Sequence, residues 1–181
     1  LVFGDPFIFT THLALKRSAE QMGIEVKVVH GISVLSLAPS CSGLDPYRFG
    51  PPVTVVYPDE RYGYFPETPY EVIADNLSRD LHTLVLLDVK RDEGRYMGFS
   101  EAMGILEELE ERLSKGVLRK GRPLILLSAL GSPREIVNWV RLGDSVDEKI
   151  YNLPKSIIVP ASIKFYEQAP PGFQRMPHRN G

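Results

Sequence analysis

The chain has 181 residues and a formal net charge of −2 at pH 7, with 21 lysines and arginines against 23 aspartates and glutamates. This balance excludes the basic footprint of a nucleic-acid-binding domain, and no apolar run approaches the ~20 residues that a membrane-spanning helix needs. Cys41 is the sole cysteine, so an internal disulfide is excluded and a cytoplasmic location is expected.

Short apolar runs rich in β-branched residues alternate with helical patterns along the chain. Such runs are typical of strands buried on both faces of a sheet that helices cover. The sequence therefore predicts an α/β protein. The expected strands are Leu1–Phe3, Val26–Val29, Val53–Tyr57, Leu84–Val89, Leu124–Ser128 and Ile157–Val159.

Three segments have helical patterns. Leu13–Met22 is expected to end with Gly23 as its C-cap. Ser33 is expected to be the N-cap of a second helix. The clearest helix is Ser100–Leu113, which carries one apolar stripe at helical spacing and is expected to have Ser100 as its N-cap.

Composition divides the chain into two parts and a tail. The segment 41–52 is rich in glycine, proline and serine and is typical of a boundary between two α/β units. The end of the chain has little hydrophobic pattern. We therefore expect a first domain over residues 1–45, a second over 46–168 and a flexible tail over 169–181.

The first dozen residues are the most informative. An apolar run ends in Gly4-Asp5-Pro6, and Thr10-Thr11-His12 then leads into a helical pattern. Glycine permits a sharp turn and the close approach of a ligand. Asp5 would place a carboxylate at the carboxyl end of a strand, where open α/β sheets bind ligands. Aspartate beside proline is also a common turn pair, so both interpretations of Asp5 stay open from the residues alone.

A second turn, His30-Gly31-Ile32, carries Ser33 and Val34. A serine between a strand and a helix can offer its hydroxyl and its backbone amide to a ligand, and simple N-capping explains it nearly as well. The four histidines have no metal-ligand spacing, so no metal is expected. His82 is expected to satisfy buried polar groups rather than to act in chemistry.

The ordered motifs resemble the diphthine synthases, a family of tetrapyrrole methylase-like methyltransferases that use S-adenosylmethionine (SAM). The resemblance extends to about Glu167. It implies two α/β domains with the cofactor cleft between them, and a first domain that is only partly present. The matching segments are Gly4–His12, Val29–Val34, Tyr64–Tyr70, Leu81–Leu84, Leu86–Val89, Arg95–Met97 and Ile157–Pro160.

The same resemblance implies a set of contacts to SAM, with S-adenosylhomocysteine as the product. At one of these positions the family often has histidine where this chain has Lys155, and a backbone contact survives that departure. No catalytic residue is assigned, because methyl transfer from a sulfonium depends on orientation more than on a general base. The implied contacts are Asp5, Ile8, Ser33, Val34, Leu87, Leu130 and Lys155.

The resemblance also implies a substrate: the aminocarboxypropyl-histidine of translation elongation factor 2, whose amine is methylated in diphthamide biosynthesis. A homodimer is implied, with no nucleic-acid or membrane partner. One alternative is a related enzyme acting on a corrin or porphyrin precursor, against which Thr10-Thr11-His12 argues. The other is a non-catalytic binding or dimerisation module, because the family's glycine-rich first loop is absent from the sequence.

Overall fold

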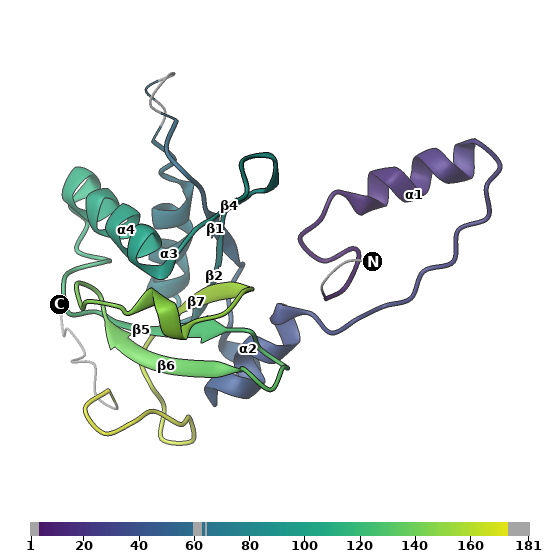
Figure 1. The fold of residues 1–181 in the computed structure, drawn as a ribbon. Helices are drawn as coiled ribbons and strands as arrows, with labels where there is room; N and C mark the ends of the chain where they lie inside the picture. Colours follow the sequence, from purple (N-terminus) through teal and green to yellow (C-terminus); the bar gives the residue numbers. More distant parts are fainter. Residues whose placement is uncertain (1–3, 60–62, 64, 174–181) are drawn as a thin grey trace. The chain divides into compact units, whose positions relative to one another are not determined.

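The structure is a computed structural model that describes residues 4–59, 63 and 65–173 (Figure 1). It consists of two compact units, the first ending at Leu37 and the second beginning at Ala38. The expected strand Leu1–Phe3 lies outside the described residues. The expected domain boundaries at residues 45 and 168 stay a prediction.

The first unit contains α1 (His12–Gln21) and the start of α2 (Val34–Ser42). Helix α1 confirms the prediction for 13–22. Its C-cap is Met22, and Gly23 follows with a φ of 74°. The amides of Gly23 and Ile24 donate to two carbonyls of the last helical turn at 3.0 Å each, which is the hydrogen-bond pattern of a Schellman ending. A glycine at this position adopts the left-handed backbone at no steric cost.

The expected strand Val26–Val29 is wrong. These residues are in neither a helix nor a strand, and no described residue of the first unit belongs to a strand. An extended segment becomes a strand only when its backbone groups pair with a neighbouring strand. The described part of this unit supplies no such neighbour, so the β-branched residues alone do not make a strand.

The second unit is built on a five-stranded mixed sheet with the order β1-β2-β7-β5-β6. Strands β1 and β2 are parallel, and every other neighbouring pair is antiparallel. The carboxyl ends of β1, β2 and β5 therefore share one end of the sheet with the amino end of β7. The strands are β1 (Val53–Val55), β2 (Thr83–Leu87), β5 (Pro123–Ser128), β6 (Ile136–Arg141) and β7 (Lys155–Val159), and a separate ribbon pairs β3 (Val89–Lys90) with β4 (Arg95–Tyr96).

Four expected strands of this unit are confirmed, as is the α/β class. Strand β6 was not predicted. It is an edge strand whose residues are all half-buried. Its polar residues Asn138 and Arg141 interrupt the apolar run that marks the central strands. The ribbon β3–β4 is also outside the predictions, because two-residue strands leave no periodicity to detect.

This unit also contains α3 (Thr68–Ser78), which contacts β1 and β2, and α4 (Phe99–Leu113), which contacts β7 and α3 (Figure 1). The predicted apolar stripe of α4 is buried in the core. The expected N-cap Ser100 is wrong, because the cap is Gly98. Phe99 is fully buried and belongs to the first turn. The carboxylate of Glu101 accepts the amide of Gly98 at 3.0 Å, so this residue acts as the capping-box glutamate.

A buried cluster of polar side chains, which we call the Glu167 network, ties the two ends of this unit together. Glu167 accepts hydrogen bonds from Arg48 Nη1 at 2.7 Å and from His82 Nε2 at 2.8 Å. The backbone amides of Asp45 and Lys164 also donate to its carboxylate, at 3.1 and 2.8 Å. The side chain of Glu167 is only 1% exposed, so its charge depends on these donors.

His82 is fully buried within this network. Its Nδ1 accepts the amide of Ala161 at 2.9 Å, so the ring proton is on Nε2, which donates to Glu167. Burial lowers the pKa of His82, and the hydrogen bond to Glu167 only partly opposes this. A neutral imidazole with both nitrogens satisfied confirms the structural interpretation of His82.

This histidine predicts a pH-dependent stability. The pKa of His82 in the folded chain lies below the ordinary value of 6.5, so the unfolded chain binds this proton more readily. The free energy of unfolding should therefore fall as the pH drops below about 6.5. Urea unfolding at about pH 7.5 and 5.5 measures the difference. The difference should shrink in His82→Gln, and an unchanged difference would contradict the assignment.

Candidate functional site

The first unit holds the turn Gly4-Asp5-Pro6. Asp5 Oδ1 accepts the amide of Phe7 at 2.9 Å, and Oδ2 lies 2.7 Å from His30 Nδ1. The Phe7 amide, followed by the His30 ring, lowers the pKa of Asp5. The carboxylate therefore carries its full negative charge near neutral pH. The turn-forming interpretation of Asp5 is directly visible in the bond to Phe7, and this bond leaves acceptor capacity on the carboxylate.

The two turns of the predicted site touch within this unit. A Cβ atom added at Gly31 would lie 2.3 Å from the carbonyl oxygen of Gly4, and Gly4 itself has a φ of 74°. Only glycines allow this approach, which places the Asp5 turn beside the turn that leads to Ser33. Ser33 Oγ accepts the amide of Leu35 at 3.2 Å. Its predicted N-cap role is thus confirmed for α2, whose first residue is Val34.

The remaining predicted residue of the first unit is Ile8, which is 37% exposed. Ser33 and Val34 are half-buried, so all three are partly accessible. His12, at the start of α1, lies with its Nδ1 3.0 Å from the carbonyl oxygen of Pro6. The turn after Asp5 is therefore anchored to the helix that follows it.

The three predicted residues of the second unit lie at the same end of its sheet. Leu87 is the last residue of β2, and Lys155 is the first residue of β7. The register pairs Leu86 with Ser156 and Ser128 with Lys155. Leu130 lies two residues beyond the end of β5. The sheet thus brings these residues together where the carboxyl ends of β1, β2 and β5 meet, which is where α/β sheets bind ligands.

Local turns fix the backbone at this end of the sheet. After β2, the carboxylate of Asp88 accepts the amide of Tyr57 at 3.2 Å, and its carbonyl accepts the amide of Met97 at 3.0 Å. After β5, Ala129 and Gly131 both have positive φ values, 48° and 75°. Leu130 thus has one residue with a left-handed backbone conformation on each side, and the chain turns sharply at this point.

The side chain of Lys155 is held by an acidic residue that the sequence did not single out. Lys155 Nζ forms an ion pair with Glu148 Oε2 and lies 5.2 Å from the ring centroid of Phe99. Glu148 Oε1 also accepts the amide of Ser100 at 2.8 Å. Glu148 belongs to a short turn seven residues before the strand, and no spacing or motif marks it.

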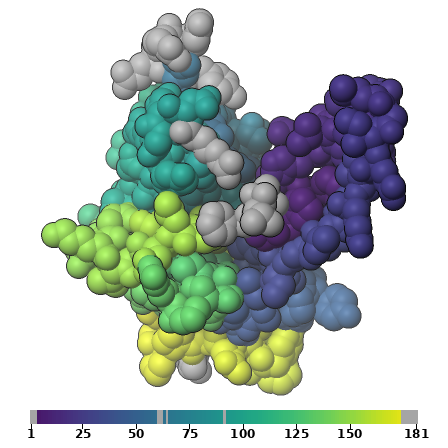
Figure 2. Space-filling view, turned by 45° about the vertical axis from the view of Figure 1, so that its right-hand side comes forward, coloured from purple at the N-terminus to yellow at the C-terminus, as the bar shows by residue number. Residues whose placement is uncertain are grey.

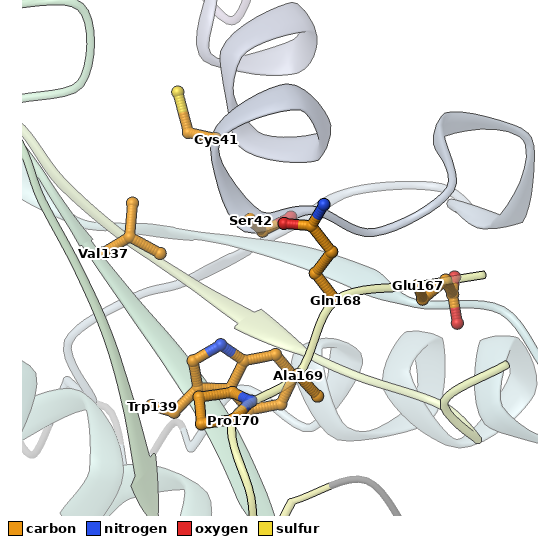
Figure 3. Close-up of a pocket in the computed structure, with 8 residues that line it drawn as sticks. All are labelled: Cys41, Ser42, Val137, Trp139, Glu167, Gln168, Ala169 and Pro170. Atoms are coloured by element: carbon orange, nitrogen blue, oxygen red, sulfur yellow. The ribbon is translucent and has the colours of Figure 1, made fainter. Parts of the chain in front are cut away.

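Figure 3 shows a separate pocket of about 560 Å³ on the second unit. It contains none of the predicted site residues. Its one charged residue, Glu167, is already bonded to Arg48 and His82. We therefore do not assign the predicted site to it. Its lining consists of Cys41, Ser42, Val137, Trp139, Glu167, Gln168, Ala169 and Pro170.

The beginning of the expected tail packs beside this pocket. The ring of Phe173 lies 5.4 Å from that of Trp139, and Arg141 Nη2 donates to the carbonyl of Gly172 at 2.8 Å. Figure 2 shows the yellow C-terminal part of the described chain next to green residues of the second unit. Gly172 and Phe173 therefore contact β6.

The described residues offer neither a candidate metal cluster nor a candidate membrane span. No group of three or more histidine, cysteine, aspartate or glutamate residues in this part of the chain is arranged to hold a metal ion. None of the described helices combines the length and the apolar character needed to cross a membrane.

The sequence is similar to the tetrapyrrole methylases and to diphthine synthases. Residues 1–144 match the family model of the tetrapyrrole (corrin/porphyrin) methylases. The chain is 45% identical to the diphthine synthase of Staphylothermus marinus over 163 residues, covering 89% of this chain and 58% of that protein. It is 36% identical to the diphthine synthase of Methanocaldococcus jannaschii over 170 residues, covering 93% and 65%.

The fold is also similar to that of a diphthine synthase. A crystal structure of diphthine synthase superimposes with a TM-score of 0.72 at 29% identity, covering 90% of this chain and 59% of that one. The chain thus spans about three-fifths of the length of the relatives it matches, and the similarity runs along nearly all of it.

Proposed function

The chain belongs to the tetrapyrrole (corrin/porphyrin) methylase family, and we propose that it acts as a SAM-dependent N-methyltransferase of the diphthine synthase type. The observation that carries this proposal is the similarity to diphthine synthases along about nine-tenths of the chain. Because the chain spans less than two-thirds of those relatives, the activity, substrate and partners of the whole protein belong to the proposal.

The chemistry of two of the predicted residues supports the proposed contacts to SAM. The ionised carboxylate of Asp5 can accept hydrogen bonds from the cofactor, because its bond to the Phe7 amide leaves acceptor capacity. Leu87 is 8% exposed and belongs to the core cluster, so the contact that we propose to the adenine is through its backbone. The proposed contacts remain Asp5, Ile8, Ser33, Val34, Leu87, Leu130 and Lys155.

Methyl transfer from SAM requires little covalent catalysis by the protein. Bound SAM would supply a methyl group on an electrophilic sulfonium. The residues of the site then have to align an amine with that methyl group and exclude water, and orientation of this kind can supply several kcal/mol of barrier reduction. An amine with a pKa of about 8 is partly neutral near pH 7, and desolvation increases the neutral fraction. A dedicated general base is therefore not required.

The proposed substrate is the aminocarboxypropyl-histidine of translation elongation factor 2, modified by a cytoplasmic homodimer. We further propose that residues 1–45 are part of one α/β domain and residues 46–168 form a second. A test of the activity is transfer of labelled methyl from SAM to elongation factor 2 that carries this histidine. Label on the histidine would support the proposal. Binding of S-adenosylhomocysteine without transfer would indicate another methyl acceptor, such as a corrin or porphyrin precursor.

The proposed role of Asp5 predicts a loss of affinity. Asp5→Ala should weaken SAM binding by roughly 1–3 kcal/mol, because hydrogen bonds to a charged acceptor are lost. Titration calorimetry measures the change.

The chain offers a matched control for this prediction. Asp45 also precedes a proline, and its Oδ1 accepts the amide of Tyr47 at 2.9 Å, as Asp5 Oδ1 accepts that of Phe7. Asp45→Ala removes the same turn bond and should leave SAM affinity unchanged. Equal affinities for SAM in the two variants would show that Asp5 only forms the turn.

A further inference from the structure

The carboxylate of Asp5 and the ring of His30 form a pair that the proposed function does not use. Asp5 Oδ2 lies 2.7 Å from His30 Nδ1. The carboxylate is ionised near neutral pH, because the Phe7 amide and the His30 ring lower the pKa of Asp5, and an ionised carboxylate only accepts hydrogen bonds. His30 Nδ1 therefore carries the proton of this bond. In the neutral imidazole, the free lone pair is then on Nε2.

The two members of this pair differ in exposure. The side chain of Asp5 is 10% exposed, and that of His30 is 69% exposed. Asp5 is also fixed through its other oxygen, because Oδ1 accepts the Phe7 amide at 2.9 Å. The ring of Phe7 meets the imidazole edge-on, with 6.1 Å between the ring centroids, and Asp5 is the charged group that the described residues place against it. The carboxylate is thus held in the turn, and the imidazole that it orients is open to solvent.

The pair lies among the proposed contacts to the cofactor. Asp5 is one of these contacts, and His30 begins the turn that leads to Ser33, which is another. The close approach of Gly31 to the carbonyl of Gly4 brings the two turns together. An exposed ring nitrogen at this place can reach a molecule that is bound against the two turns.

The proposed reaction contains a proton that such a nitrogen can accept. An amine with a pKa of about 8 is about nine-tenths protonated at pH 7, and an ammonium group has no lone pair with which to attack a methyl group. The neutral fraction allows the reaction without a base. Where the site has excluded water, however, an ammonium that binds needs an acceptor for its proton. Imidazole is the side chain that exchanges a proton most readily near neutral pH.

We propose that His30 is a catalytic base that accepts this proton at Nε2, and that Asp5 is the positioning residue that holds its ring. This inference rests on the methyltransferase activity proposed above and adds a residue to it. The substrate ammonium gives one proton to Nε2, and its nitrogen keeps the electron pair, which forms the new bond to the methyl carbon. The bond from that carbon to sulfur breaks, and its electrons stay on sulfur, which becomes a neutral thioether. The carboxylate of Asp5 balances the charge of the imidazolium until the proton passes to water.

The test compares methyl transfer to elongation factor 2 that carries the aminocarboxypropyl-histidine, by the wild-type chain and by His30→Gln, at about pH 7 and 9. We expect kcat to fall about tenfold at pH 7, the ratio of protonated to neutral amine, and less than about threefold at pH 9, where most of the amine is already neutral. The affinity for S-adenosylhomocysteine, measured by calorimetry, should change less than about threefold, because the product binds without a proton transfer. Added imidazole should restore part of the activity of His30→Ala at pH 7.

The other histidine of the first unit supplies a matched control. His12 Nδ1 lies 3.0 Å from the carbonyl oxygen of Pro6 and does not face a carboxylate, so any loss of kcat in His12→Gln should be the same at both pH values. Nitrogen NMR of the wild-type chain gives a readout that needs no turnover. His30 should be the tautomer with its proton on Nδ1, and Asp5→Ala should abolish this preference.

The outcomes separate the two proposals. A loss of kcat in His30→Gln that is equal at both pH values, or no loss, would overturn the role of His30 and leave the methyltransferase proposal standing. A neutral His30 with its proton on Nε2 in the wild-type chain would have the same meaning. A wild-type chain that transfers no methyl group to this factor would overturn the proposed substrate, and with it the proton transfer assigned to His30.

Discussion

Glu167→Gln is expected to lower the free energy of unfolding by about 1.5–3 kcal/mol, the usual contribution of a hydrogen bond to a charged group, while Arg48 keeps the carboxylate of Asp80 as a second partner at 3.0 Å. The carboxylate accepts hydrogen bonds from Arg48, His82 and two backbone amides. A glutamine keeps one accepting oxygen, and its amide group would face donors instead of offering them an acceptor. Arg48, which is 9% exposed, would lose its most buried counter-charge.

Urea unfolding followed by fluorescence measures this loss. Trp139 is the single tryptophan and lies in the second unit, so its signal reports on the unit that contains the Glu167 network. Glu108→Gln removes an exposed ion pair by the same substitution and should cost less than about 1 kcal/mol. Similar losses in both variants would show that burial does not decide the contribution of Glu167.

Leu106→Ala is expected to cost about 2–5 kcal/mol. Leu106 is fully buried in α4, within the core cluster that joins this helix to the sheet. Removing its branched end takes apolar surface out of the core and leaves a cavity that the packed strands can close only in part. The midpoint of urea unfolding should fall without a change in the slope of the transition.

An exposed aliphatic residue of the same unit supplies the comparison. Ile150 is 51% exposed, so Ile150→Ala should cost well under about 1 kcal/mol. If Leu106→Ala cost as little as Ile150→Ala, the apolar stripe of α4 would not be the contact that fixes this helix to the sheet.

The core of the second unit follows from its sequence because burial leaves a clear pattern. The central strands β5 and β7 contain the apolar runs Leu124–Leu127 and Ile157–Val159, and α4 shows its stripe at helical spacing. The edge strand β6 lacks this signal because one of its sides has no neighbouring strand and its residues are half-buried. Val26–Val29 shows the opposite error, since β-branched residues indicate a strand only where a neighbour is present to pair with them.

Part of the candidate site could likewise be predicted from the sequence, and part could not. The turns that carry Asp5 and Ser33 were predictable, because glycine, proline and capping residues act through adjacent backbone. The convergence of Leu87, Leu130 and Lys155 depends on strand order and register, which residues alone do not give. The pairing of Glu148 with Lys155 depends on a turn that folds back on α4. It leaves no trace in the sequence.

The position of β7 has a consequence for the order in which the protein is made. It is the last strand of the described residues, yet it lies between β2 and β5 at the centre of the sheet. While the chain is being synthesised, β2 and β5 have no common neighbour, and their inner edges stay open to other chains. Arg48 and His82 also have no bond to Glu167 until that residue has been synthesised, because it lies 119 residues after Arg48 and 85 residues after His82. The two halves of this sheet therefore join only after β7 has left the ribosome, and a pause in translation before β7 would prolong an aggregation-prone state.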